Sequence, residues 1–109
     1  MTGPEEQPSA ETAATGSAFL FHEVGLHARP SVKVTKVAKG FRAKVELATT
    51  EGGPWIDAKS IVKVMAAKAP KGSTLYFRAV GEDAEAAVGA LVALVEQDFP
   101  ESEPRDARG

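Results

Sequence analysis

Two stretches of this sequence alternate strictly between polar and apolar side chains, at residues 42–47 and 74–79. Successive side chains of a β-strand point to opposite faces, so this alternation predicts strands with one buried and one solvated face. The apolar members are Ala43, Val45 and Leu47 in the first stretch and Leu75, Phe77 and Ala79 in the second. A sheet made of such strands has an apolar face that other elements must cover.

Three further stretches carry apolar residues at the spacing of an amphipathic α-helix. The sets are Val34, Val37, Ala38 and Phe41; Ile61, Val64 and Met65; and Ala84, Ala87, Val88, Leu91, Leu94 and Val95. Pro30 suits the first helical residue of the first set, while Ser60 and Asp83 are N-cap candidates for the other two. The middle helix is short, and Val62 falls off its stripe, so part of its apolar surface is expected to stay exposed.

Two shorter segments complete the predicted order of elements. The run Phe19-Leu20-Phe21 suits a strand without showing which side is buried, and Trp55-Ile56-Asp57 follows the turn signal Gly52-Gly53-Pro54, which predicts a hairpin. The order is then strand, helix, strand, strand, helix, strand, helix. With short connections, the helices are expected to cover one face of a mainly antiparallel sheet, in the α+β class.

The length of 109 residues fits one domain. Residues 1–16 and 100–109 are rich in Pro, Glu, Ser, Thr, Gly and Asp and poor in large apolar residues. Such segments bury too little apolar surface to offset their ordering entropy, so we expect both to be disordered tails. Residues 17–99 are expected to form the domain.

The charge and residue usage exclude several classes of function. A net charge of −2 argues against a nucleic-acid partner, and no apolar run is long enough to predict a membrane span or signal peptide. The absence of cysteine fits a reducing compartment, so the cytoplasm is the expected location. His22 and His27, without cysteines or clustered carboxylates, make a poor metal site, and no cofactor is indicated.

The stretch Gly25-Leu26-His27-Ala28-Arg29-Pro30 is a candidate phosphate site. A neutral imidazole can attack phosphorus with one nitrogen and form a P–N bond that is easily cleaved. His27 precedes a predicted helix, whose free N–H groups and positive dipole end favour an anion, and Arg29 can bind phosphate oxygens through two parallel hydrogen bonds. The spacing alone equally allows His27 to be a polar loop residue and Arg29 a solvated charge.

The whole hexapeptide resembles the phosphorylation signature of HPr, the histidine-containing phosphocarrier of the bacterial phosphoenolpyruvate-dependent sugar phosphotransferase system (PTS). The similarity extends to Asp57-Ala58-Lys59-Ser60-Ile61-Val62-Lys63-Val64-Met65, which resembles the family's second-helix region, and covers roughly residues 17 to 97. It implies an open-faced β-sandwich with four strands and three helices in the order βαββαβα.

The resemblance also implies a function and its residues. His27 would be phosphorylated on Nδ1 by phospho-Enzyme I and would donate to an Enzyme IIA domain, with Arg29 stabilising the phosphate. Ile61, Val62 and Met65 match the positions where the family docks its partners. The chain would then be a stoichiometric carrier and not an enzyme, and one small domain that meets two partners through one patch is expected to be a monomer.

Ser60 has two interpretations, as a structural N-cap or as a regulatory site. It aligns with the serine that HPr kinase/phosphorylase modifies in some bacteria, where added charge obstructs docking. However, the kinase-regulated group commonly has Gly where Lys63 stands and a Leu-Gly pair near Ala67-Lys68.

Three alternatives remain open at this stage. A regulatory paralogue of the nitrogen-related phosphotransferase branch would keep the same histidine. An acylphosphatase-like hydrolase would need a water-orienting Asn, and the chain contains no Asn. An RNA-binding α+β domain would match the aromatic residues Phe19, Phe21, Tyr76 and Phe77 but needs a basic surface.

Overall fold

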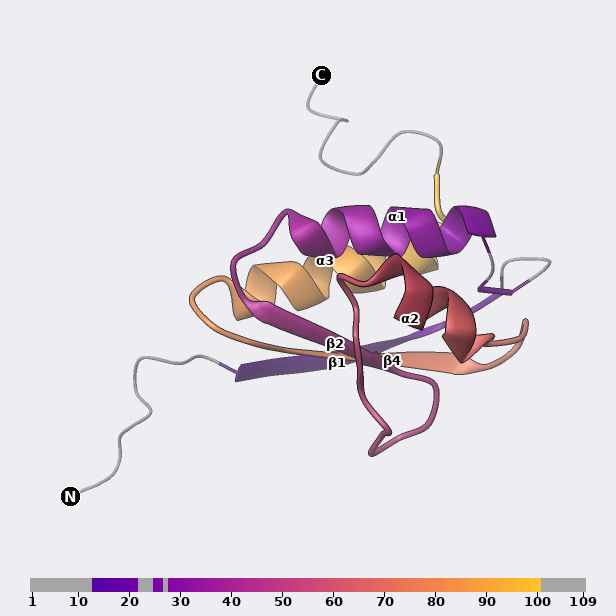
Figure 1. The fold of residues 1–109 in the computed structure, drawn as a ribbon, viewed down its shortest axis with the longest axis horizontal. Helices are drawn as coiled ribbons and strands as arrows, with labels where there is room; N and C mark the ends of the chain where they lie inside the picture. The colour runs from indigo at the N-terminus through magenta and orange to yellow at the C-terminus, as the bar shows by residue number, and fades with distance from the viewer. Residues whose placement is uncertain (1–12, 22–24, 27, 101–109) are drawn as a thin grey trace.

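The computed structural model describes residues 13–21, 25–26 and 28–100, and its helices all lie on one face of a single sheet (Figure 1). The elements in order are β1 (Ala13–Phe19), α1 (Ala28–Lys39), β2 (Lys44–Ala48), β3 (Ile56–Asp57), α2 (Ile61–Ala67), β4 (Thr74–Val80) and α3 (Ala84–Glu96). This is the predicted βαββαβα order, so the α+β open-faced sandwich is confirmed.

The sheet has four antiparallel strands in the spatial order β1-β4-β2-β3. In the central pair, Leu47 lies opposite Phe77 and Val45 opposite Ala79, and all four side chains are buried. The alternation predicted for residues 42–47 and 74–79 is therefore confirmed. The predicted hairpin is confirmed as well, because Leu47 of β2 pairs with Ile56 of β3.

The start of strand β1 differs from the boundary that the sequence predicted for the N-terminal tail. It begins at Ala13, so residues 13–16 pair with β4, although the sequence predicted a disordered tail up to residue 16. The strand is rich in small residues, which give no hydrophobic signal. At Gly16, an added Cβ would lie 2.7 Å from Val88 Cγ1, so the missing side chain allows α3 to pack closely on this strand. Residues 1–12 and 101–109 lie outside the described residues.

The exposure of Phe19, Leu20 and Phe21 shows which side of this segment is buried. Leu20 is buried in the core, whereas Phe19 and Phe21 are exposed on either side of it. The strand itself ends at Phe19. Leu20 continues the backbone pairing, since its N–H donates to the Ser73 carbonyl at 2.8 Å.

Helix α1 begins two residues earlier than the position of Pro30 suggested. Its first residue is Ala28, so Pro30 stands third and not first. The proline is nevertheless compatible with a helix there, because the first N–H groups of a helix have no carbonyl partner within it. Val34 and Ala38 are fully buried as predicted, while Val37 and Phe41 are partly buried against the core.

Asp83 does not have the capping role predicted for it. Its backbone is at the N-cap position of α3, but its side chain makes no capping bond to the helix. Instead, its carboxylate accepts hydrogen bonds from the N–H groups of Arg42, at 2.9 Å, and Ala43, at 2.8 Å. The bond from Arg42 has the larger effect, and together the two bonds lower the pKa of Asp83 below its usual value of 3.8. Asp83 thus joins the start of α3 to the chain entering β2.

Candidate functional site

The segment just before the predicted phosphoryl acceptor is held against the end of α2. Gly25 is buried with φ at +73°, and an added Cβ would lie 2.5 Å from the Ala69 carbonyl oxygen. Leu26 is buried in the core, and its N–H donates to that same Ala69 oxygen at 2.8 Å. Only glycine combines this backbone conformation with so close a contact. Both residues therefore tie the chain leading into α1 to the loop after α2.

Helix α1 follows at once and begins at Ala28. Its first turn contains no acidic residue, so its unpaired N–H groups and the positive end of its dipole are not neutralised from within the turn. Arg29 is its second residue and is exposed. His27 itself lies outside the described residues, so the predicted acceptor is located only through its sequence neighbours Leu26 and Ala28.

Exposed apolar side chains gather on the two helices next to this segment. In α2, Val62 is 74% exposed and Met65 is 41% exposed, whereas Ile61 is partly buried. The prediction that apolar surface remains on this helix is confirmed. Helix α1 packs against α2 and adds Val32, which is 51% exposed and which the helical stripe did not single out. We call Val32, Ile61, Val62 and Met65 the apolar patch.

A shallow hollow of about 390 Å³ runs between the two helices within this patch. Val32 and Ile61 line its apolar part, and Lys36 and Lys39 line its basic part. Val32 could have been found from sequence by the signal that singled out Val62, since each is an apolar residue off the buried stripe of its helix.

Ser60 is the N-cap of α2, as predicted. Its backbone is extended, with φ at −105° and ψ at 110°, and its Oγ accepts a hydrogen bond from the Lys63 N–H at 3.3 Å. The hydroxyl therefore satisfies one of the unpaired N–H groups of the first turn.

The described residues place no metal centre next to this segment. Within residues 13–21, 25–26 and 28–100, no three His, Cys, Asp or Glu side chains come together as metal ligands. Over the same part of the chain, no helix has the length and apolar character needed to cross a membrane.

Comparison with known proteins assigns this arrangement to a family. The model for the PTS HPr component phosphorylation site matches residues 18–97. The phosphocarrier protein HPr of Cupriavidus necator is 39% identical over 84 residues, covering 77% of this chain and 92% of that protein. The chain therefore belongs to the HPr family of phosphocarrier proteins.

Two further comparisons show similarity to another named relative and to a solved structure. The phosphocarrier protein NPr of Escherichia coli is 32% identical over 82 residues, covering 75% of this chain and 90% of that protein. A crystal structure of HPr from Thermoanaerobacter tengcongensis superposes with a TM-score of 0.68 at 30% identity, covering 84% of this chain and 98% of that one. Relatives bearing the names HPr and NPr thus both align over most of the domain.

Proposed function

We propose that this protein carries a phosphoryl group on His27, accepted from phospho-Enzyme I and passed to an Enzyme IIA domain of the phosphotransferase system. The observation that supports this most directly is the hydrogen bond that anchors Leu26 to the Ala69 carbonyl, with Gly25 packed against the same group, shortly before α1 begins. This anchoring fixes where the motif enters the helix, and a phosphoryl group there would meet the positive end of the helix.

The chemistry proposed for the site needs few protein groups. The lone pair of Nδ1 of neutral His27 attacks phosphorus while the P–N bond of the donor phosphohistidine breaks, and onward transfer repeats the exchange with the next histidine. Phosphoryl transfer depends chiefly on positioning and charge stabilisation. In this proposal Arg29 binds the phosphate oxygens from the first turn of α1, which a planar guanidinium does better than an ammonium group.

We further propose that the apolar patch docks both partners. Three of its four side chains, those of Val32, Val62 and Met65, lie exposed on α1 and α2, the two helices that flank the anchored segment. An apolar patch that is small and bordered by lysines suits a weak interface that forms and dissociates quickly. Exchange of this kind is what a carrier serving two partners in turn requires.

The decisive experiment incubates the protein with Enzyme I and phosphoenolpyruvate and measures intact mass. We expect one phosphoryl adduct, lost in acid and stable in alkali, in the wild type. It should vanish in His27→Ala and persist in His22→Ala, which is the matched control because it removes the chain's other histidine. No adduct with a competent Enzyme I, or an adduct retained in His27→Ala, would refute the assignment.

Sugar uptake and nitrogen-related regulation are both compatible with this chemistry. The identity to an NPr protein supports the regulatory branch, and the identity to HPr proteins supports the sugar branch. Offering the phosphorylated protein to Enzyme IIA domains of each branch separates them, because the cognate domain should be phosphorylated faster.

Ser60 is proposed as a second, regulatory phosphorylation site. Its hydroxyl is a helix N-cap, and added negative charge would be favoured at that terminus while adjoining the exposed Val62. Incubation with HPr kinase/phosphorylase and ATP tests this. Modification that is stable in acid and absent from Ser60→Ala would support it, and no modification would refute it.

A further inference from the structure

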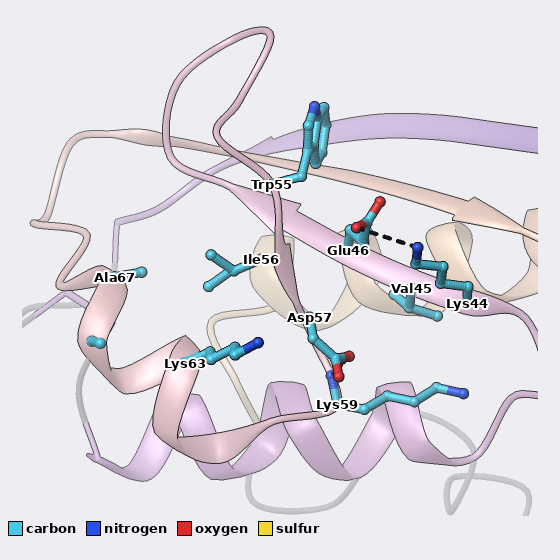
Figure 2. Close-up of a pocket in the computed structure, with 10 residues that line it drawn as sticks. Lys44, Val45, Glu46, Trp55, Ile56, Asp57, Lys59, Lys63 and Ala67 are labelled. Carbon is cyan, nitrogen blue, oxygen red and sulfur yellow. Dashed lines mark hydrogen bonds and ion pairs between the residues drawn. The ribbon is translucent and has the colours of Figure 1, made fainter.

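A second concave site lies on the other side of α2, between that helix and the β2–β3 hairpin (Figure 2). It is a groove of about 750 Å³. Lys63 and Ala67 line it from one face of α2, whereas Val62 and Met65 of the apolar patch are not among its lining residues. The groove is therefore distinct from the surface proposed for partner docking.

The groove carries more basic than acidic groups. Lys44, Lys59 and Lys63 line it together with the acids Glu46 and Asp57. Glu46 is already neutralised by Arg78, whose Nε lies 2.7 Å from Glu46 Oε1. A local excess of positive charge thus remains in a chain whose net charge is −2, and this excess favours an anionic ligand.

The three lysines differ in the hydrogen bonds and ion pairs that they already form within the protein. Lys59 Nζ donates to the Phe41 carbonyl at 2.8 Å, and Lys44 Nζ lies 3.9 Å from Glu46 Oε2. Lys63 is exposed and forms no ion pair with any carboxylate that the structure describes. Figure 2 shows its ammonium group reaching from α2 toward the hairpin. Lys63 is therefore the cation best placed to bind a ligand in the groove.

Trp55 borders the groove at the hairpin, and Figure 2 shows its ring pointing away from α2, so a ligand that reaches both Trp55 and Lys63 must extend across β3. The guanidinium carbon of Arg78 lies 4.3 Å from the centroid of the indole ring, in a cation–π contact. Since Arg78 is held in turn by Glu46, the ring is positioned before any ligand arrives. Ile56 and Ala67, which are partly buried, add apolar surface to the groove on the side nearer α2.

We propose that this groove binds a nucleoside phosphate, with the base packed against Trp55 and the phosphate bound by Lys63 and Lys44. An inorganic anion would leave Trp55 and the apolar surface unused, and a neutral aromatic compound would leave the lysines unused. The volume falls within the range of roughly 300–1,000 Å³ that is typical of small-molecule sites. This binding is independent of phosphorylation at His27.

The test is a titration with ADP, adenosine and pyrophosphate, followed through Trp55 fluorescence and amide NMR shifts. Trp55 is the only tryptophan of the chain and also borders a second hollow with Thr15 and Tyr76, so its emission reports binding beside the ring, and the amide shifts of Lys63 and Ala67 assign that binding to the groove. We expect saturable binding of ADP, with adenosine and pyrophosphate each at least about tenfold weaker. Pyrophosphate binding as tightly as ADP would overturn the aromatic part of the proposal, and no saturation by ADP at about 5 mM would overturn all of it.

Matched variants locate the site. Lys63→Ala should weaken ADP binding about tenfold, because it removes a charged donor to the phosphate. Lys71→Ala removes another exposed lysine, which lies outside the groove, and should change the affinity less than about twofold. His27→Ala should bind ADP as the wild type does. An equal loss in the Lys63 and Lys71 variants would show non-specific charge attraction and refute the assignment.

Discussion

Helices α2 and α3 are both rich in apolar residues, yet they bury very different shares of them. Helix α3 buries Ala84, Ala87, Val88, Leu91, Leu94 and Val95 against the sheet, whereas α2 buries only Val64. The apolar residues of α3 are thus accounted for by packing, and Val62 and Met65 of α2 are not. Apolar surface that packing leaves exposed, next to a candidate phosphate site, is what indicates a docking surface.

The two helices also begin differently. Ser60 caps its own helix through its hydroxyl, while Asp83 leaves α3 uncapped and binds the chain entering β2. Helix α3 is held by its buried face, so its start residue is available for a tertiary contact. Helix α2 has seven residues and little buried surface, so it depends more on local stabilisation.

The largest expected effect on stability comes from α3. Leu91→Ala should lower the free energy of unfolding by about 2–5 kcal/mol, because it leaves a cavity in the core. Urea denaturation measures the change. A loss below about 1 kcal/mol would mean that α3 is not the main source of packing stability, which would remove the contrast with α2.

Removing the cap of α2 should have a smaller effect. Ser60→Ala should lower the free energy of unfolding by about 1 kcal/mol, because the Lys63 N–H loses its acceptor. Ser60→Asp, which keeps a capping acceptor, is the control and should be close to wild type in urea denaturation. Equal destabilisation by both variants would argue against a capping role.

Asp83 should contribute a pH-dependent part of the stability. Its folded pKa lies below the usual 3.8, so its contribution is present above that value and is lost as the pH falls through the folded pKa. The urea midpoint of the wild type, measured between about pH 6 and pH 2, should therefore fall more steeply at the acid end than that of Asp83→Asn. Parallel curves would contradict the proposed role of the carboxylate in binding Arg42 and Ala43.

The smallest effect on stability is expected for the apolar patch. Val62→Ser should change the free energy of unfolding by less than about 0.5 kcal/mol, because the side chain is 74% exposed. If the patch docks partners as proposed, the same change should weaken binding of Enzyme I about tenfold, measured by calorimetry. Val92→Ser is a useful contrast, since Val92 is packed against the core and should mainly lose stability. Unchanged Enzyme I binding in Val62→Ser would exclude this residue from the interface.

Much of the fold was predictable because apolar residues recur at the spacing of a strand or of a helix through most of the chain. Strict alternation identified β2 and β4 with their buried residues, and helical spacing identified all six buried residues of α3. The start of β1 was missed, because strand residues such as Ala13 and Gly16 have little hydrophobicity and are ordered by backbone pairing with β4. Asp83 was misassigned because the same residue type serves as a cap and as a distant hydrogen-bond acceptor.

Some features of the candidate site were likewise predictable from the sequence, and others were not. The motif around His27 was visible in the sequence, as was the exposure of Val62, because both depend on residue type and local spacing. The role of Gly25 was not, since the Ala69 carbonyl that excludes a side chain there is brought close only by the fold. The groove at Trp55 likewise depends on how α2 and the hairpin pack together.

The sequence is thus sufficient for the order of elements, their buried faces and the family resemblance, because periodicity and motif are local properties of the chain. Tertiary structure decided which carbonyl anchors Leu26 and excludes a side chain at Gly25, and which backbone groups Asp83 binds. These features join residues that are far apart along the chain, such as Asp83 and Ala43, and no local pattern encodes the distance between such residues in the folded protein.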